Sequence, residues 1–247
     1  MCEHKVVFLY QCVHNIARKH KTIMIKPLIA SLGLLLAGCS QQFQDLNATF
    51  NEAMFGDADV STTAEYIQDL PYASIYAQIN DQGKIFMVLA FVGQNPETGA
   101  EQLKWMSSDK AMIVTENGRV VQTLLLPYEN LSGLTAKPIN ALVPSFDLST
   151  EPKAQRWQAT YDWQPDYRFG YSANVVRTYV NQETIQTPLA AIETSKFIEQ
   201  VSYPALGEQI ENEYWVNSEG KVVKTVQHLG PDMTRLELTL LKLYQAN

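Results

Sequence analysis

The sequence predicts a mainly β fold: a single antiparallel β-barrel-like or sandwich domain with two short N-terminal helices. The first observation behind this is that apolar and polar residues alternate with period two in short runs from Tyr72 onward. The second is that turn-forming residues separate those runs at short intervals. The third is that neither half of the chain alone would close its sheet edges, whereas a barrel or sandwich uses both halves to do so.

The N-terminal region is typical of a secretory signal. An apolar run over residues 25–38, with Lys26 as the one basic residue at its head, is followed directly by a cysteine, so that residues 36–39 read Leu-Ala-Gly-Cys. Small residues before the cut are what such a signal requires, and the cysteine thiol receives a diacylglyceryl group. The run is too short to span a bilayer, which takes about 20 apolar residues. We therefore expect Cys39 to be the lipid-attachment residue. Ser40 follows it, and the resemblance to bacterial lipoproteins in general implies that a serine there leaves the protein open to export to the outer membrane, so outer-membrane lipid is expected as a partner through the acylated Cys39.

Residues 1–38 are expected to be removed, which leaves one mature β domain over residues 39–247. Residues 1–22 form an unusually long polar stretch ahead of an apolar run, so we expect Met24 to be the true start. The two cysteines in that stretch lack the spacing of a zinc site, so no metal is expected there.

The mature part is acidic. The whole chain has a formal net charge of -7, and the segment ahead of Cys39 carries five basic side chains and one acidic one, so its removal leaves -11. Nucleic acid and anionic lipid head groups both favour clusters of lysine and arginine and repel carboxylates. We therefore expect no nucleic-acid partner, and any attachment to a membrane must come from the lipid.

Two short helices are expected at the start of the mature chain. Apolar residues recur at helical spacing over residues 46–56, where a glycine ends the run. Thr62 with Glu65 three residues on forms a capping box, and Pro71 ends the second helical run.

Strands follow in close succession. Alternation over residues 73–79 predicts a half-buried strand, and the apolar run 84–93 predicts a central one. Asn117-Gly118 is the strongest turn signal, because both residues accept the positive φ of a two-residue type I′ hairpin. About eleven strands are expected in all, and the later ones lie at 156–163, 168–180, 194–203, 210–216, 221–229 and 234–244.

Residues 127–155 break this rhythm. They contain four prolines and keep no sustained period. We expect a long connection there, which crosses from one sheet to another.

Side chains that carry catalysis are scarce. The mature part holds one histidine, His228, in a predicted strand, and no cysteine besides Cys39. This removes His/Cys zinc sites and cysteine nucleophiles, and the motifs of serine hydrolases, phosphate loops and zinc proteases are missing. We expect His228 to be a surface or hydrogen-bonded structural residue, and we expect no catalytic residue, no metal and no cofactor.

Paired carboxylates are the remaining catalytic option. A glycosidase needs two of them facing one cleft at a set separation, whereas neighbours along a strand point to alternate faces. In a chain this acidic, solvation explains each of the candidate groups, which are Asp57 with Asp59, Asp162 with Asp166, and Glu208 with Glu211 and Glu213.

One predicted hairpin is crowded with aromatic residues, namely Trp157, Tyr161, Trp163, Tyr167, Phe169 and Tyr171. Alternate residues share a face, so the first three are expected on one face of the first strand and the last three on one face of the second. Flat rings on a rigid sheet can stack on sugar rings, with Asp162 or Arg168 nearby to bond hydroxyls. The same rings suit a barrel core, and core is the commoner outcome for aromatic residues.

Several segments of the mature chain stand in a recognisable order behind the lipoprotein signal. They lie at residues 53–57, 70–77, 103–105, 109–115, 214–216 and 220–227. In this order they resemble the YjbF/GfcB lipoproteins associated with group 4 capsule and exopolysaccharide operons. The resemblance implies an outer-membrane lipoprotein, on the periplasmic face, with a barrel-like domain that assists polysaccharide secretion or assembly. It implies no catalytic residues.

Three functions stay open at this point. The leading one is a non-enzymatic, lipid-tethered module that binds polysaccharide or polysaccharide-export proteins. The second is a polysaccharide-modifying enzyme that uses carboxylates, and the third is a carrier of a lipid-linked or apolar ligand in a barrel cavity. Converging carboxylates would favour the enzyme, an apolar cavity the carrier, and a closed core with an exposed aromatic patch the binding module.

Overall fold

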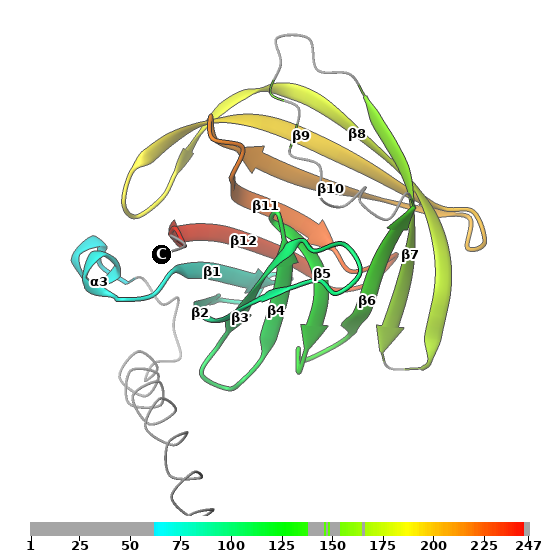
Figure 1. Ribbon diagram of the computed structural model, residues 1–247, viewed down its shortest axis with the longest axis horizontal. Coiled ribbons are helices and arrows are strands. Elements are labelled where there is room, and N and C mark those ends of the chain that lie inside the picture. The colour runs from blue at the N-terminus through cyan, green and yellow to red at the C-terminus, as the bar shows by residue number, and fades with distance from the viewer. Residues whose placement is uncertain (1–61, 138–145, 147, 149–153, 165, 245–247) are drawn as a thin grey trace, which may run out of the picture. The chain divides into compact units, whose positions relative to one another are not determined.

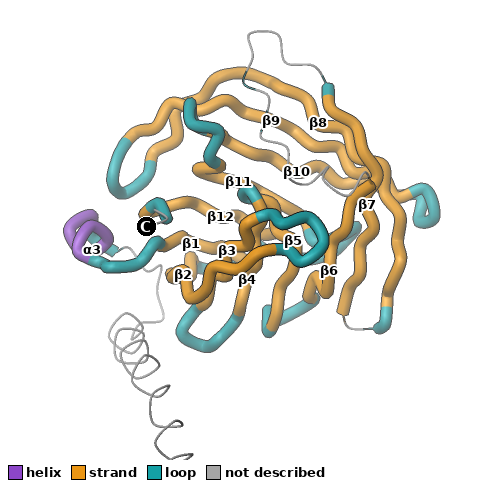
Figure 2. The backbone as a smooth tube through the Cα atoms, viewed as in Figure 1, coloured by secondary structure: helices purple, strands orange, loops and turns teal. Residues whose placement is uncertain are grey.

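The computed structural model describes residues 62–137, 146, 148, 154–164 and 166–244. This part of the chain contains one short helix and twelve strands (Figure 1, Figure 2). Their bounds are α3 Ala64–Asp69, β1 Ser74–Ile79, β2 Lys84–Gln94, β3 Glu101–Met106, β4 Met112–Glu116, β5 Arg119–Leu124, β6 Asn130–Lys137, β7 Gln155–Gln164, β8 Arg168–Gln186, β9 Ala191–Tyr203, β10 Glu208–Val216, β11 Val222–His228 and β12 Arg235–Lys242.

The twelve strands form one antiparallel sheet. Its order is β5-β4-β3-β2-β1-β12-β11-β10-β9-β8-β7-β6, so consecutive strands pair with each other except β5 and β6, which are the two ends of the sheet, and β1 also pairs with β12. The sheet curls round until its two end strands, β5 and β6, come together (Figure 1). The fold is a nearly closed barrel, which confirms the barrel expectation over the sandwich.

Side chains bridge the seam between β5 and β6 in the described residues. The backbone N–H of Leu131 donates to Thr123 Oγ1 at 2.9 Å, and Gln122 Nε2 donates to the carbonyl oxygen of Ser132 at 3.1 Å. Edge strands expose unpaired backbone groups, so these bonds cover the last open edge of the sheet.

The helix α3 lies where the second helical run was expected, but its cap is displaced by one residue. Thr63, not Thr62, is the N-cap, and its Oγ1 accepts a hydrogen bond from the backbone N–H of Tyr66 at 3.3 Å. The backbone N–H of Thr62 instead donates to the hydroxyl of Tyr76 on β1 at 2.8 Å. The capping box predicted from Thr62 and Glu65 is therefore wrong, and the helix expected over residues 46–56 lies outside the described residues.

The Asn117-Gly118 hairpin is confirmed. Glu116 pairs with Arg119, and the two turn residues have φ values of 46° and 77°. The tip contacts β11, six strands away in the sheet order, since Gln227 Nε2 donates to the carbonyl oxygen of Gly118 at 3.0 Å. A contact between strands so far apart in the sheet runs across the barrel interior, so the tip helps to fill it.

The long connection expected over residues 127–155 is wrong in part, because the segment contains β6 and joins strands of one sheet instead of crossing between two sheets. Leu131, Leu134 and Ala136 of β6 are buried, but a bulge between Leu131 and Gly133 shifts the alternation. A bulge adds one residue to a strand and so interrupts its period of two. The predicted strands at 168–180 and 194–203 are also too short, because β8 and β9 continue as a largely exposed ribbon in which neither face shows an apolar pattern.

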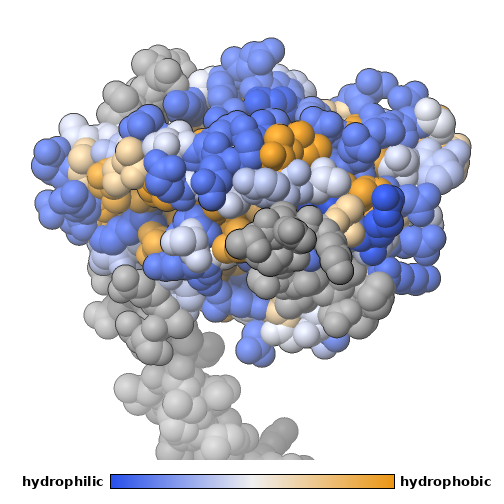
Figure 3. Space-filling view, turned by 90° about the horizontal axis from the view of Figure 1, so that it is seen from above, coloured by the Kyte–Doolittle hydropathy of each residue, from blue (hydrophilic) through white to orange (hydrophobic). Residues whose placement is uncertain are grey.

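The barrel interior is filled by side chains rather than by solvent. Large buried residues from nearly every strand form one core, among them Trp105, Tyr161, Trp163 and Tyr203. The surface seen from above the view of Figure 1 is mostly hydrophilic, with separate small hydrophobic patches (Figure 3). On such a surface, a cluster of exposed aromatic side chains is therefore a candidate binding site.

Candidate functional site

Three members of the aromatic hairpin belong to the core. Trp157, Tyr161 and Trp163 are at most 8% exposed, which confirms that they share a face and shows that this face is the interior. Trp163 is fully buried, its Nε1 donates to the carbonyl oxygen of Leu229 at 2.6 Å, and its ring stacks on Tyr161 at 5.8 Å between centroids. These rings are unavailable to a sugar polymer, so the stacking expectation does not extend to them.

Phe169 and Tyr171 do not share a face. Gly170 lies between them at a φ of 77°, and its N–H donates to Asp162 Oδ1 at 2.7 Å. This irregularity, opposite the bulge between Tyr161 and Trp163, turns Phe169 outward while Tyr171 packs against the Trp163 ring at 5.1 Å. The expectation that the last three aromatic residues are co-facial is therefore wrong.

Tyr167 and Phe169 form the exposed tip of this hairpin. They are 89% and 52% exposed, and their ring centroids lie 6.3 Å apart. Tyr167 has a φ of 52° and Asp166 a φ of 75°, a left-handed conformation that costs a residue with a side chain about 1–3 kcal/mol. Backbone strain of this kind collects at functional sites, and here it presents an aromatic ring to solvent.

A cleft of about 420 Å³ opens beside this tip. Three turns of the same barrel end line it: β5–β6 through Tyr128 and Glu129, β7–β8 through Asp166 and Arg168, and β11–β12 through Asp232, with Gln164, Pro231 and Met233 completing the lining. We call these residues, together with Tyr167 and Phe169, the aromatic-tip cleft. Tyr167 and Phe169 do not line the cleft itself, but they are the sequence neighbours of Asp166 and Arg168, which do. Exposed rings and hydrogen-bonding groups are the two features with which a protein surface holds a polyhydroxylated chain.

Hydrogen bonds hold the cleft walls in place. Glu129 Oε2 accepts from the hydroxyl of Thr234 at 2.6 Å, and the hydroxyl of Tyr128 accepts from Gln82 Nε2 at 2.7 Å. The guanidinium carbon of Arg168 lies 4.9 Å from the centroid of the Trp163 ring. The cleft is therefore anchored to the core on one side and to a neighbouring turn on the other.

The cleft contains three carboxylates. Asp166 and Asp232 are exposed on turns, and Glu129 is half-buried and accepts hydrogen bonds from the backbone N–H and the hydroxyl of Thr234. A carboxylic acid catalyst needs an environment that keeps its proton at neutral pH, and exposure on a turn does not provide one. Of the other predicted groups, Asp162 accepts the bond from Gly170, and Glu213 forms an ion pair with Lys196 at 2.6 Å. The pair Asp57 and Asp59 lies outside the described residues.

His228 is a hydrogen-bonded structural residue, as expected. It ends β11, its Nδ1 lies 3.0 Å from the carbonyl oxygen of Glu211, and its backbone N–H donates to Asn212 Oδ1 at 2.9 Å. Within the described ranges, no group of three or more His, Cys, Asp or Glu side chains is placed to hold a metal ion. In the same residues no helix is long and apolar enough to cross a membrane.

A buried ion cluster is the feature that sequence reasoning missed. Glu199 on β9 is fully buried, and its Oε1 accepts from Nη2 of Arg119 and, at 2.7 Å, from Nε of Arg177. Burial alone would raise the pKa of Glu199, but the two arginines overcome it and hold that pKa below its usual range. Arg119 follows the hairpin tip, so this cluster ties the tip to β8 and β9 across the interior.

Aromatic rings surround the ion cluster. The guanidinium carbon of Arg177 lies 4.0 Å from the Phe146 centroid and 5.0 Å from that of Trp157, and that of Arg119 lies 5.4 Å from the Tyr214 centroid. Such cation–π contacts offset part of the cost of burying a guanidinium group. The cluster cannot touch a polymer, so it supports the barrel rather than the site.

The fold is shared with a bacterial lipoprotein of solved structure. The structure of the lipoprotein YmcC from Escherichia coli (K12) matches with a TM-score of 0.69 and 26% sequence identity, covering 84% of this chain and 98% of that one. Residues 47–241 match the family described as "Group 4 capsule polysaccharide lipoprotein gfcB, YjbF", and the chain belongs to this family.

Two curated relatives come from the same bacterium, Escherichia coli (strain K12). The lipoprotein GfcB is 32% identical over 222 residues, which cover 88% of this chain and 99% of the relative. The lipoprotein YjbF is 31% identical over 228 residues, which cover 89% of this chain and 98% of the relative. Both are named as uncharacterized lipoproteins, and neither name gives an enzyme activity.

Proposed function

We propose that the protein is an outer-membrane lipoprotein, anchored through acylated Cys39 on the periplasmic face, that binds a capsule or exopolysaccharide chain during secretion. The observation that carries this proposal is the aromatic-tip cleft, where two exposed rings at a strained turn lie beside a polar cleft. The family description, which names group 4 capsule polysaccharide, supports a polysaccharide as the ligand.

Stacking supplies the affinity in this proposal. A sugar ring has an apolar face of C–H groups that packs on an aromatic ring, and its hydroxyls bond side chains at the edge. Tyr167 and Phe169 supply two such rings, and Asp166 and Asp232 supply acceptors. Because the cleft is open and its rings are few, it suits repeated weak contacts with a long polymer rather than tight capture of a small molecule.

Binding accounts for the site better than the two alternatives do. Two of the three cleft carboxylates, Asp166 and Asp232, are exposed and lack the burial that a glycosidase acid requires, and the third, Glu129, accepts two hydrogen bonds from Thr234. The barrel core is packed with large side chains, and the cavity of about 250 Å³ beside the β4–β5 hairpin tip contains the buried carboxylate of Glu116, which an acyl chain would leave without a donor.

Complementation of a deletion strain tests this function. The chain carrying both Tyr167→Ser and Phe169→Ser should restore much less surface polysaccharide than the unaltered chain, at equal protein level and equal melting temperature. Phe91→Ser is the matched control, since Phe91 on β2 is 43% exposed but lies outside the cleft. Full polysaccharide yield from the double variant would contradict the proposal.

A further inference from the structure

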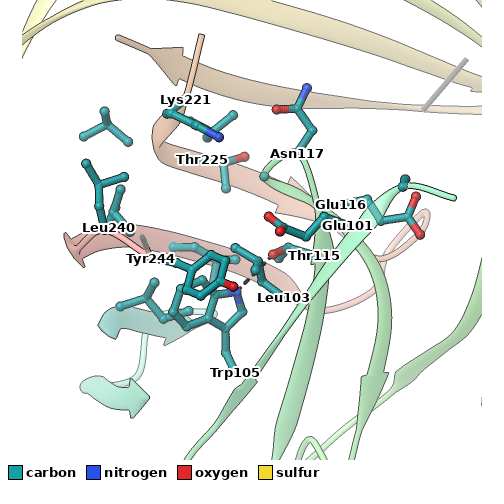
Figure 4. Close-up of a pocket in the computed structure, with 17 residues that line it drawn as sticks. Glu101, Leu103, Trp105, Thr115, Glu116, Asn117, Lys221, Thr225, Leu240 and Tyr244 are labelled. Carbon is teal, nitrogen blue, oxygen red and sulfur yellow. Dashed lines mark hydrogen bonds between the residues drawn. The ribbon is translucent and has the colours of Figure 1, made fainter. Parts of the chain in front are cut away.

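A second cavity lies at the opposite end of the barrel from the aromatic-tip cleft. β11 begins at Val222, which lines this second cavity, and runs to His228, just before the turn that lines the cleft. The cavity has a volume of about 250 Å³ and lies between the β4–β5 hairpin tip and the wall made by β1, β11 and β12 (Figure 4). No part of the proposed polysaccharide contact uses it.

The floor of this cavity is apolar. Trp105 on β3, Leu238 and Leu240 on β12 contribute to it. The one polar atom of the Trp105 ring, Nε1, is already satisfied because it donates to Thr115 Oγ1 at 3.0 Å. The ring is only 3% exposed, so it forms part of the packed base of the cavity, and the apolar surface open to a ligand is that of the half-buried Leu103 and Leu240.

Glu116 is a buried acceptor in the lining. It is 1% exposed, and its Oε1 accepts from Asn95 Nδ2 at 2.8 Å and from Gln102 Nε2 at 2.7 Å. Its Oε2 is buried and has no hydrogen-bond partner within the described residues. A buried carboxylate oxygen without a donor costs free energy, so this position favours a ligand that brings an O–H or N–H group.

The charged side chains at the mouth of the cavity further restrict the kinds of ligand that it can bind. Glu101 and Lys221 are exposed there, so the lining carries two carboxylates and one ammonium group (Figure 4). An anionic ligand would meet the negative excess, and a hydrocarbon chain would leave Glu116 without a donor. A ligand with an apolar face and uncharged or cationic donor groups avoids repulsion by the carboxylates and can donate a hydrogen bond to Glu116.

We propose that this cavity binds one glycosyl unit that is neutral or carries an ammonium group, and that it excludes uronic acids. The sugar ring packs on the apolar floor at Leu103 and Leu240, and a hydroxyl or amino group of the sugar donates to Glu116. The volume is just below the roughly 300–1,000 Å³ of sites for drug-sized ligands, which fits a single ring. This cavity is separate from the aromatic-tip cleft, so the proposal can be tested independently of the proposed function.

Saturation-transfer NMR on the acylated protein in detergent tests the proposal, with glucosamine, glucose and glucuronate as probes near neutral pH. Glucosamine and glucose should receive saturation, and glucuronate should bind at least tenfold more weakly. Glu116→Gln should weaken glucosamine binding at least tenfold, because an amide presents a donor in place of one carboxylate oxygen.

Two further variants keep the test decisive. Glu101→Gln alters only an exposed group at the mouth, so it remains folded even if Glu116→Gln does not, and it should weaken glucosamine more than glucose. Glu208→Gln, exposed at the other barrel end, is the matched control and should bind as the unaltered chain does. The proposal is overturned if no probe binds, if glucuronate binds as well as glucosamine, or if neither altered glutamate of the cavity changes binding.

Discussion

Replacing Glu199 with glutamine tests the buried ion cluster that ties the hairpin tip to the far wall of the barrel. Glu199 is fully buried and is the counter-charge to both Arg119 and Arg177. Removing one partner of a buried ion pair leaves an uncompensated buried charge and costs about 3–5 kcal/mol. Because two guanidinium groups lose their partner here, we expect the upper half of that range.

Urea unfolding at neutral pH measures this loss. With a slope of about 2–3 kcal/mol per M of urea, a loss of about 4–5 kcal/mol lowers the unfolding midpoint by about 1.3–2.5 M. Glu193→Gln is the matched control, since Glu193 lies on the same strand but is exposed. An exposed substitution changes the free energy of unfolding by no more than about 0.5 kcal/mol.

The stability lost in Glu199→Gln should depend on pH, and the direction follows from the pKa of Glu199. The pKa of Glu199 is lower in the folded protein than its ordinary value, so its ionised form stabilises the fold above the unfolded pKa of about 4.3. That stabilisation is lost as the pH falls through the folded pKa. The gap between the unaltered chain and Glu199→Gln should therefore be widest near neutral pH and should close in acid. Equal midpoints for Glu199→Gln and Glu193→Gln would refute this account of the cluster.

Three further predictions concern the turn, the anchor and the histidine. Gly118→Val should lower the free energy of unfolding by at least about 2 kcal/mol, because valine is strained at this positive φ and its Cβ would clash with the Val222 side chain. Gly207→Val is the control, because Gly207 has a φ of 70° but open space around it, and it should lower the melting temperature less. Cys39→Ala should leave a largely soluble protein of altered mass, because it removes the thiol that carries the acyl chains, and two or more chains are what anchor a protein stably. A membrane-bound species of unchanged mass would disprove acylation at this residue. His228→Ala should leave polysaccharide secretion intact, because its ring bonds only a carbonyl group of the barrel; loss of secretion by a well-folded variant would favour catalysis.

Local patterns predicted most of the strands because each strand has one buried face. The Asn117-Gly118 turn was predictable from two residues that accept positive φ, and β10 to β12 from alternation and turn residues. β6 was missed because its bulge shifts the buried positions by one residue. Apolar and polar residues alternate only where strands pair in regular register, so a strand that contains a bulge cannot be recognised from alternation alone.

The candidate site was predictable only in part. Alternation placed Trp157, Tyr161 and Trp163 on one face, but it does not say which face is the interior, and it did not reveal the turn of the chain at Gly170. The buried cluster did leave a signal, since Glu199 shares the parity of buried Phe197 and Val201 along β9. That signal was unused because charged residues are rarely fully buried unless they are paired, and the partners come from distant strands.

Direct binding of polysaccharide by the purified, acylated protein tests the central claim. Isothermal titration with surface polysaccharide from the source strain should show binding by the unaltered chain and by Phe91→Ser. Each stacked ring contributes about 0.5–1.5 kcal/mol beyond its buried area. The double variant Tyr167→Ser with Phe169→Ser should therefore bind about 5- to 150-fold more weakly. Equal affinity for the double variant and the unaltered chain, or no binding by the unaltered chain, would contradict the claim that this protein holds polysaccharide at its aromatic tip.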